Sequence, residues 1–274
     1  MQKQINYHQS TVYYNVIGSG KPVVPVHGFG EDSEVWKYQV DFLKDKFQLI
    51  IPDLPGSGLS KVDSWSRSGS GTVGSNYLSI EWLADCIKAI LDTENISSCS
   101  LIGHSMGGYI TLAFAEKYPD LLNKFGLLHS TAYADSEEKI QTRRRGIEFI
   151  KEHGAYAFLK QSTPNLFGKK FSEEHPEAIT ELIERNKLFA AEALIQYYEA
   201  MIARPDRTAV LKNTAIPFLH IIGAEDKAAP LKDCLEQCHL PAITYVTILE
   251  QSAHMGMWEE TNKANKALAA FLEC

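Results

Sequence analysis

The sequence predicts an α/β protein with a mostly parallel central sheet, helices on both faces and an inserted helical cap. Three observations lead to this prediction. Short apolar segments alternate with amphipathic helical segments over most of the chain, which is typical of a parallel sheet covered on both faces. One long stretch, residues 132–207, has helical patterns and no convincing strand. At 274 residues, the chain is long enough to bury one large core.

The first half of the chain begins with a predicted hairpin, because two segments that alternate apolar and polar residues precede Gly18-Ser19-Gly20. Helical spacing then places Trp36, Val40 and Leu43 on one face. Pro119 is expected to end the third helix. In chain order, we expect strands over residues 4–7, 11–17, 23–26, 47–51, 98–102 and 125–128, and helices over 35–46, 81–91 and 107–118.

The second half returns to the same alternation after the helical stretch. We expect strands over residues 218–222 and 244–249, each followed by a helix, over 231–238 and 259–272. The chain is therefore expected to form a core domain from residues 1–131 and 208–274. Residues 132–207 would form a cap inserted after the sixth predicted strand, and such caps shape substrate access.

The composition excludes several classes of protein. Lys and Arg number 27 against 34 Asp and Glu, a formal charge of −7, which has the wrong sign for a general nucleic-acid binder. No apolar run approaches the ~20 residues of a membrane-spanning helix, and the first residues lack the apolar core of a signal peptide. Five cysteines without paired spacing argue against a disulfide framework or a zinc site. We expect a cytoplasmic protein with no nucleic-acid or membrane partner.

The motif with the strongest chemical signal is GHSMGG, which spans Gly103 to Gly108 between a predicted strand and a predicted helix. Small residues on both sides of Ser105 permit a sharp turn that presents its hydroxyl at the start of the helix. Helix N-termini carry partial positive charge, which favours a developing anion. Ser105 is therefore the candidate nucleophile.

A reactive serine needs a base and a group that orients the base. Asp226 directly follows one late strand, and His254 follows the last strand. In the order of these residues and their positions after strands, the chain resembles the α/β-hydrolase superfamily, whose nucleophile, acid and histidine follow one another along the chain in that order. The resemblance implies that Ser105, Asp226 and His254 form a catalytic triad.

The resemblance extends to the groups that would bind the oxyanion. The family takes one donor from the backbone N–H after the nucleophile, here Met106, and a second from an HGxG loop. His27-Gly28-Phe29-Gly30 resembles that loop, so the second donor would be the N–H of Phe29. Residues 53–60, DLPGSGLS, resemble the family's DxxGxGxS loop, which we interpret as scaffold.

Other residues have weaker assignments. His129 ends a predicted strand at the edge where ligands bind, so it is a candidate substrate contact. Asp135 is an alternative triad acid, because some family members take the acid from that position. The run Arg143-Arg144-Arg145 is expected to be a solvated helix face. Five aromatic residues of the cap would line an acyl pocket or form the cap's own core: Phe158, Phe167, Phe189, Tyr197 and Tyr198.

Two local features are unusual. Residues 61–76 are rich in Ser and Gly, so we expect a mobile loop, with an ordered lid as the alternative. Pro25 stands inside a predicted central strand, where the family usually has an aliphatic residue and where a proline removes a hydrogen-bond donor.

The resemblance implies a serine hydrolase that cleaves a carboxylic ester of a small molecule through an acyl-enzyme, with no metal and no organic cofactor. The same triad also serves carbon–carbon hydrolysis, aminopeptidase-like amide cleavage, acyl transfer and perhydrolysis, so these reactions stay open. A ligand receptor with little turnover is the alternative from a different class. Assembly into a homo-oligomer is equally open.

Overall fold

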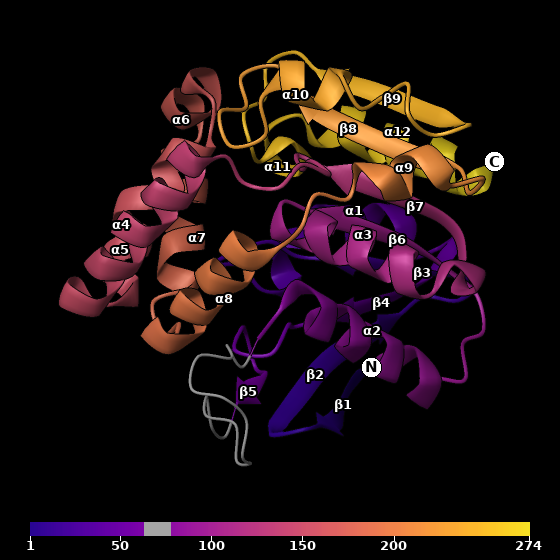
Figure 1. Cartoon of the computed structure of the whole chain (residues 1–274), viewed down its shortest axis with the longest axis horizontal. Coiled ribbons are helices and arrows are strands. Elements are labelled where there is room, and N and C mark those ends of the chain that lie inside the picture. Colours follow the sequence, from indigo (N-terminus) through magenta and orange to yellow (C-terminus); the bar gives the residue numbers. More distant parts are fainter. Residues whose placement is uncertain (63–77) are drawn as a thin grey trace.

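A single twisted sheet forms the centre of the computed structural model, which describes residues 1–62 and 78–274 (Figure 1). The strands follow the order β1-β2-β4-β3-β6-β7-β8-β9, and β5 pairs with β2. Their bounds are β1 Gln2–Tyr7, β2 Ser10–Ile17, β3 Lys21–Val26, β4 Phe47–Pro52, β5 Lys61–Val62, β6 Cys99–His104, β7 Leu122–Leu128, β8 Phe218–Gly223 and β9 Thr244–Leu249.

The sheet is parallel from β4 to β9 and antiparallel at its start. β1 and β2 form the predicted hairpin, with Tyr7 opposite Ser10, and β2 runs antiparallel to β4. The pairs β4–β3, β3–β6, β6–β7, β7–β8 and β8–β9 are all parallel. The predicted fold class, a mostly parallel sheet with helices on both faces, is confirmed.

Helices cover both faces of the sheet because the buried strands are apolar on both sides. Val24 and Val26 of β3 pack with the helices α2 and α3, while the alternate residue Val23 packs with α1 and α12. The helices outside the region between β7 and β8 are η1 Ser33–Trp36, α1 Lys37–Leu43, α2 Ile80–Thr93, α3 Met106–Lys117, η2 Pro119–Leu121, α10 Leu231–Leu235, α11 Gly256–Glu259 and α12 Thr261–Glu273.

A run of helices separates β7 from β8, as the sequence predicts for residues 132–207. We call this run the helical insertion, and Figure 1 shows it beside one end of the sheet. Its two ends meet where the Arg207 N–H donates to the Ala132 carbonyl at 2.8 Å, and it contacts the rest of the chain where the Tyr197 hydroxyl donates to the Pro55 carbonyl at 2.8 Å. Its elements, with the helix that follows it, are α4 Glu137–His153, α5 Ala155–Ser162, η3 Thr163–Leu166, α6 Lys169–Glu174, α7 Pro176–Arg185, α8 Ala191–Ala203 and α9 Thr208–Asn213.

The predicted helix boundaries shift by a few residues. The segment 35–46 divides into η1 and α1 and ends at Leu43, because the charged residues 44–46 precede a return into the sheet. The helix predicted over 231–238 ends at Leu235, and the last helix divides at Glu260 into α11 and α12. All five cysteines are free thiols.

Pro25 is accommodated by the way in which β3 is paired. β3 pairs with β4 only from Lys21 to Val23, whereas its pairing with β6 runs from Val23 to Val26. The proline therefore lies beyond the last residue that pairs with β4, where a lost donor costs the sheet little.

The predicted loop over residues 61–76 is only partly described. Lys61 and Val62 form β5, paired with Thr11 and Ser10 of β2, so the prediction of a loop is wrong for these two residues. Residues 63–76 of the predicted loop lie outside the described residues.

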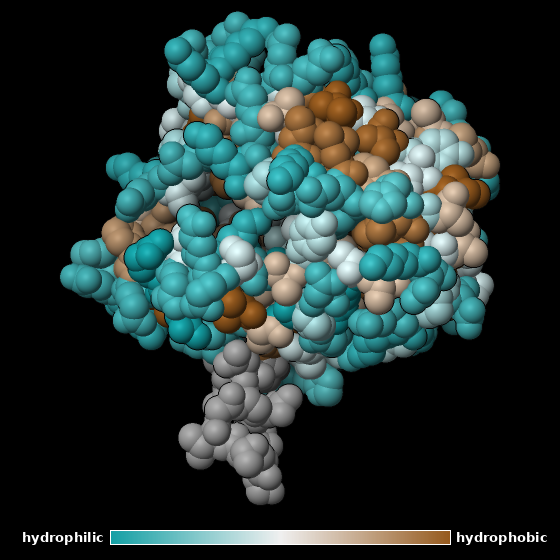
Figure 2. Space-filling view, turned by 45° about the horizontal axis from the view of Figure 1, so that its top comes forward, coloured by the Kyte–Doolittle hydropathy of each residue, from teal (hydrophilic) through white to brown (hydrophobic). Residues whose placement is uncertain are grey.

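The edge strand β9 leaves apolar side chains partly exposed, at Tyr245, Val246 and Ile248, and Ile243 just before the strand is exposed too. In Figure 2, hydrophobic surface gathers on the upper part of the face shown, amid polar residues. An edge of this kind is the part of a sheet most open to pairing with another strand. Among the described helices, none has the length and apolar character needed to cross a bilayer.

Candidate active site

Ser105 stands in a strained turn between β6 and α3. Its backbone has φ 51° and ψ −116°, a conformation that non-glycine residues rarely adopt. The turn needs glycine on both sides, since a Cβ at Gly103 would lie 2.2 Å from the Gly107 carbonyl oxygen, and one at Gly107 would lie 2.2 Å from the Val26 carbonyl oxygen. The sequence motif and the turn therefore have the same cause, close packing of backbone around the serine.

The structure brings Ser105, His254 and Asp226 together in one hydrogen-bonded chain. His254 Nε2 lies 2.8 Å from Ser105 Oγ, and His254 Nδ1 lies 2.8 Å from Asp226 Oδ2. The three residues come from the segments that follow β6, β8 and β9 at the carboxyl edge of the sheet, where β7 lies between β6 and β8. With its Nδ1–H bonded to the carboxylate, the imidazole presents the lone pair of Nε2 to the hydroxyl.

Asp226 is buried and held in its ionised form. Its Oδ1 accepts the N–H groups of Ala228 at 2.8 Å and Ala229 at 2.9 Å. Burial opposes ionisation, but the neighbouring His254 and His129 outweigh it and keep the pKa of Asp226 well below its ordinary value. The carboxylate is thus available as a negative partner for a histidine that becomes protonated.

His129 lies behind Asp226 instead of at the cavity. Its Nε2 accepts the Gly256 N–H at 3.1 Å, so the proton is on Nδ1, which faces Asp226 Oδ2 at 3.3 Å. Burial lowers the pKa of His129 to about 4, which keeps the ring neutral. A Cβ at Gly256 would lie 2.5 Å from His129 Nε2, so this glycine makes room for the ring. The placement does not support the predicted substrate contact, because the side chain has no exposed surface.

Among the residues that the structure describes, one cluster could offer three ligand atoms to a metal ion: His129, Asp226 and His254, whose nitrogen and oxygen atoms lie within 4.8 Å of one another. His254 Nδ1 donates to the carboxylate, and His129 Nδ1 lies 3.3 Å from it, so a cation would have to replace the hydrogens on both nitrogens. The arrangement therefore fits a hydrogen-bonded relay better than a metal centre.

A partly buried glutamate, Glu259, fixes the backbone on both sides of His254. Glu259 accepts the N–H groups of Ala253 and Met255, each at 3.0 Å, and that of Gly168 at 2.7 Å. Burial raises the pKa of Glu259 above its ordinary value. This carboxylate ties the histidine loop to the helical insertion.

Two backbone N–H groups are free to bind an oxyanion near Ser105. Within the described part of the chain, neither the Phe29 N–H nor the Met106 N–H has a hydrogen-bond partner. The loop that carries Phe29 is fixed by Glu31, whose Oε2 accepts the Gly28 N–H at 2.7 Å. Such preorganised donors are what a tetrahedral intermediate requires.

His104 lies under the turn between two acceptors. Its Nδ1 is 3.0 Å from Glu31 Oε2, and its Nε2 is 2.9 Å from the His254 carbonyl oxygen. Because an oxygen acceptor faces each nitrogen, both nitrogens donate, and the ring is an imidazolium paired with a carboxylate. Burial lowers the pKa of His104, but the charge and hydrogen bond of Glu31 outweigh burial and raise it. This histidine therefore holds the Glu31 and His254 loops together and does not bond Ser105 Oγ.

This buried pair gives a testable dependence of stability on pH. The raised pKa of His104 contributes stability that is complete below its ordinary value of 6.5 and is lost as pH rises through the raised value. Burial raises the pKa of Glu31, but the combined effect of the His104 charge and hydrogen bond brings this pKa below its ordinary value of 4.5. The stability that ionised Glu31 contributes is therefore complete above pH 4.5. We expect Glu31→Gln to lower the Tm most between these two values, and less at about pH 9.

Thermal unfolding of both proteins at about pH 5.5 and about pH 9 measures the effect. Exposed Glu173→Gln is the matched control, since it removes the same charge from the surface. An equal loss of Tm at both pH values would contradict an ion pair at these residues.

A cavity of about 180 Å³ opens in front of Ser105 and His254. Core residues form one wall and the helical insertion forms the other, and Figure 2 shows the surface hollowed where the two meet. Of the five aromatic residues predicted for a pocket or a cap core, Phe158 and Tyr198 line this cavity. Tyr197 and Phe167 are buried in the hydrophobic cores instead.

Arg143 also lines the cavity, which corrects the prediction for the arginine run. Arg144 and Arg145 are exposed as expected, but the Arg143 side chain is only 18% exposed and its Nε bonds Asp135 Oδ2. Asp135, the alternative acid, is paired with Arg143 and Arg204 and does not bond His254. The prediction fails for Arg143 because helix α4 packs against α8 on that side.

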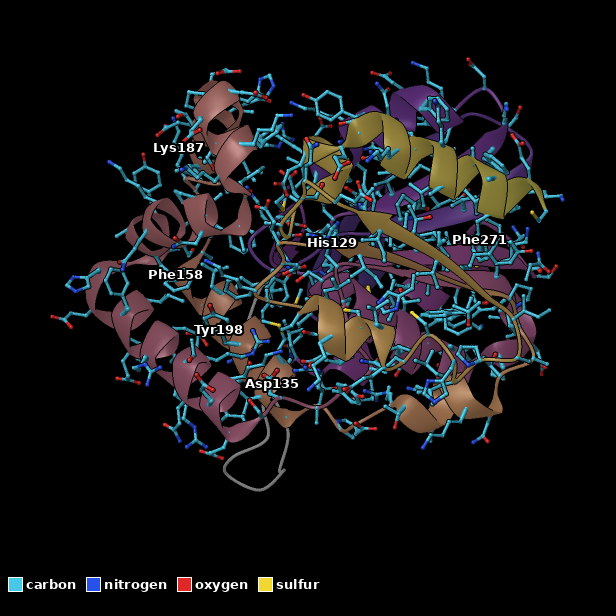
Figure 3. All side chains as sticks on the ribbon, turned by 90° about the horizontal axis from the view of Figure 1, so that it is seen from above. His129, Asp135, Phe158, Lys187, Tyr198 and Phe271 are labelled. Carbon is cyan, nitrogen blue, oxygen red and sulfur yellow. The ribbon has the colours of Figure 1, made fainter. Side chains whose placement is uncertain are left out.

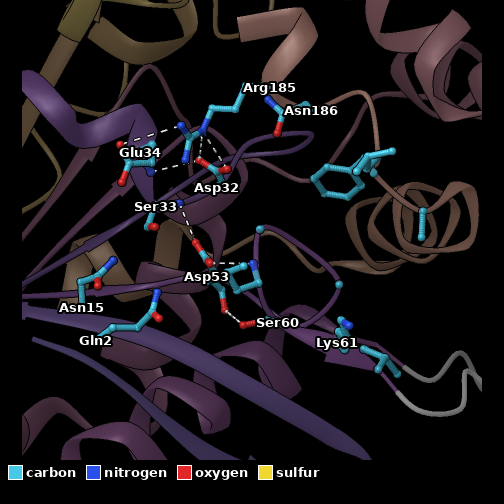
Figure 4. Close-up of a pocket in the computed structure, with 17 residues that line it drawn as sticks. Gln2, Asn15, Asp32, Ser33, Glu34, Asp53, Ser60, Lys61, Arg185 and Asn186 are labelled. Carbon is cyan, nitrogen blue, oxygen red and sulfur yellow. Dashed lines mark hydrogen bonds and ion pairs between the residues drawn. The ribbon is translucent and has the colours of Figure 1, made fainter.

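A second pocket lies at the DLPGSGLS loop (Figure 4). Asp53 Oδ1 accepts the Ser33 N–H at 2.9 Å and Oδ2 accepts the Leu59 N–H at 2.8 Å, so this carboxylate holds the loop. Asp32 pairs with Arg185 of the helical insertion at 3.0 Å. The acidic side chains of this pocket are thus engaged in structural bonds, in agreement with the interpretation of the loop as scaffold.

Sequence reasoning missed Glu31, Glu259 and the role of Arg143. Glu31 follows the HGFG motif directly, and this position next to a loop of backbone donors is a signal that could have been used. Glu259 and Arg143 carry no such signal, because their roles depend on how the helical insertion packs, through Gly168 for Glu259 and through helix α8 for Arg143.

Comparison with known proteins agrees with this geometry. Residues 21–146 match the sequence profile of the α/β hydrolase fold family. The chain is 26% identical over 271 residues to (E)-2-((N-methylformamido)methylene)succinate hydrolase of Acinetobacter baylyi, covering 96% of this chain and 94% of that protein. It is 34% identical over 117 residues to the karrikin insensitive 2 receptor IA of Petunia hybrida, covering 42% of this chain and 40% of the receptor.

Among solved structures, a thermophilic esterase from Thermogutta terrifontis in a malate-bound form superposes with a TM-score of 0.88. The two sequences are 27% identical, and the match covers 100% of this chain and 98% of the esterase. The hydrolases among these relatives support hydrolase activity. The sequence profile, the sheet order and the turn at Ser105 together show that the chain belongs to the α/β-hydrolase superfamily.

Proposed function

We propose that the protein is a serine hydrolase that cleaves a carboxylic ester of a small molecule through an acyl-enzyme. The observation that carries this proposal is the hydrogen-bonded chain from Ser105 through His254 to Asp226, which opens on a cavity. A nucleophile, a base and a group that orients the base are the three parts that acyl transfer requires.

In the first step, Ser105 Oγ attacks the ester carbonyl carbon while His254 Nε2 takes the hydroxyl proton. The carbonyl oxygen becomes an oxyanion, which the N–H groups of Phe29 and Met106 would bind. Collapse of this intermediate breaks the carbon–oxygen bond to the alcohol, which takes the proton from His254. Water then repeats the sequence on the acyl-enzyme and releases the acid. No step in this sequence requires a metal or a cofactor.

We infer that residues 132–207 act as a cap domain on a core formed by residues 1–131 and 208–274. Support comes from the cavity wall, which takes Ser105 and His254 from the core and Phe158, Leu159 and Tyr198 from the insertion. Substrate would therefore be enclosed between the two parts. A cavity of about 180 Å³ suits a small molecule.

Hydrolysis of p-nitrophenyl esters from acetate to long acyl chains tests the proposal. Activity is expected for the wild type, and stoichiometric labelling by an alkyl phosphonate ester should place the adduct on Ser105 by peptide mass mapping. Ser105→Ala protein, folded but inactive and unlabelled, is the control. Activity that survives in this variant would overturn the proposal.

Two other readings have specific support. The partial match to a karrikin receptor favours a receptor with little turnover, and this reading predicts ligand-dependent thermal stabilisation without product. The similarity to (E)-2-((N-methylformamido)methylene)succinate hydrolase favours trials of non-ester substrates if esters fail. Both use the same residues, so the Ser105→Ala control serves each of them.

A further inference from the structure

The cavity in front of Ser105 holds one cationic side chain that the proposed reaction does not use. Arg143 of α4 lines the cavity together with Ser105 and His254. We propose that this arginine selects substrates that carry a carboxylate, so that the natural ester is an anion. The inference rests on the proposed function and specifies its substrate class.

The charges around Arg143 leave an excess of positive charge. Asp135 is fully buried and pairs with two guanidinium groups, those of Arg143 and Arg204. Arg204 is itself buried and lies over the Tyr109 ring at 3.7 Å. Two cations that share one carboxylate leave one net positive charge in a poorly hydrated place, which favours an anionic ligand.

The geometry leaves one side of the Arg143 guanidinium unused. Nε donates to Asp135 Oδ2 at 2.5 Å and Nη2 donates to Oδ1 at 3.3 Å. No residue that the structure describes accepts a hydrogen bond from Nη1. Guanidinium groups bind carboxylates through two parallel donors, so the free edge can receive a substrate carboxylate while Asp135 holds the other edge.

Neighbouring side chains hold this group in place. The guanidinium carbon lies 5.6 Å from the centre of the Tyr198 ring, within the range of a cation–π contact. Figure 3 shows Asp135 and Tyr198 on the side of the helical insertion that faces the core. A guanidinium fixed by an anion and a ring loses little entropy when a ligand binds, which makes it a selective contact.

The other carboxylate on the cavity wall does not cancel this charge. Glu31 lines the cavity too, but its Oε2 is bonded to the His104 ring and to the Gly28 N–H. Because His104 is an imidazolium, the Glu31 charge is balanced within its own pair. The unbalanced charge at the cavity is therefore that of Arg143.

Paired esters test the selectivity. We would compare mono-p-nitrophenyl esters of dicarboxylic acids, from succinate to adipate, with matched esters in which an isopropyl group replaces the free carboxylate. For the best chain length, wild-type kcat/KM should favour the carboxylate ester. Arg143→Met should lower that preference by about thirtyfold, the loss expected for a charge-assisted hydrogen bond.

Controls separate selectivity from damage to the fold. The ratio of the two esters is measured within each variant, so a general loss of activity cancels. Exposed Arg144→Met removes the same charge from the same helix and should leave the ratio unchanged. Arg143→Lys keeps the positive charge without the two parallel N–H donors of the guanidinium, and it should retain part of the preference for the carboxylate ester. A wild type that prefers the isopropyl ester, or an unchanged ratio in Arg143→Met, would refute the inference.

A binding measurement keeps this inference separate from the proposed function. Adipate is titrated calorimetrically into Ser105→Ala protein, with and without Arg143→Met. Binding that requires Arg143 supports the anion site even if no ester is hydrolysed, a result that would reject the ester hydrolase alone. Equal binding in both proteins, or binding in neither, rejects the anion site.

Discussion

His254→Ala is expected to lower kcat for ester hydrolysis by about a millionfold, the loss seen when a triad histidine is removed from a serine protease. Its Nε2 is the base 2.8 Å from Ser105 Oγ, and no other described imidazole bonds this hydroxyl. Without it, the serine has no acceptor for its proton during attack and the leaving alcohol has no donor. Single-turnover and steady-state kinetics with the best p-nitrophenyl ester measure the loss.

Exposed His239→Ala is the matched control and should keep wild-type kcat. The His254→Ala protein should retain a cooperative thermal transition, because its neighbours Ala253 and Met255 stay bonded to Glu259. A kcat within tenfold of the wild type would show that His254 is not the base.

Asp226→Asn is expected to lower kcat by about 10⁴, as in the corresponding serine-protease variant. The asparagine keeps the shape of the side chain, and its oxygen can still accept the Ala228 and Ala229 N–H groups. The amide nitrogen would then replace Oδ2, so that an N–H donor faces His254 and His129 where the carboxylate oxygen was an acceptor. His254 is left in the wrong tautomer, with its Nε2 protonated toward the serine.

A pH–rate profile of this variant is the most informative measurement. Loss of the carboxylate removes the stabilisation of protonated His254, so the residual activity should rise toward alkaline pH, where hydroxide can act as base. Asp120→Asn, at an exposed position of the short helix η2, is the control for the loss of one charge. A variant with kcat near that of the wild type would mean that another group orients His254.

Most of the scaffold could be predicted because its causes are local. A few neighbouring residues are enough to indicate the glycine turn around Ser105, each apolar strand and each helical spacing. Ser105, Asp226 and His254 could be proposed as one site because each lies within a few residues of the end of a strand of a parallel sheet, and such strand ends meet at one edge.

The remaining features of the site depend on contacts between distant residues. Glu31 and His104 are separated by 73 positions, so their ion pair follows from the packing of a loop against the end of β6. Arg143 differs from Arg144 only in the direction of its side chain, and that direction matters because α4 lies against α8. A sequence pattern gives the face of a helix but not the neighbour of that face.

The hydrogen bond between Arg207 and Ala132 has a consequence for how this protein can be recombined. Because the insertion leaves and rejoins the chain at one point, its length can change without altering the distance between β7 and β8. We expect that residues 133–206 can be grafted as a unit between related chains, provided that the recipient supplies the partners of Tyr197 and Arg185, which here are the Pro55 carbonyl and Asp32. Arg143 lies on the grafted segment and Ser105 does not, so with the roles proposed for them a graft would transfer substrate preference without the nucleophile.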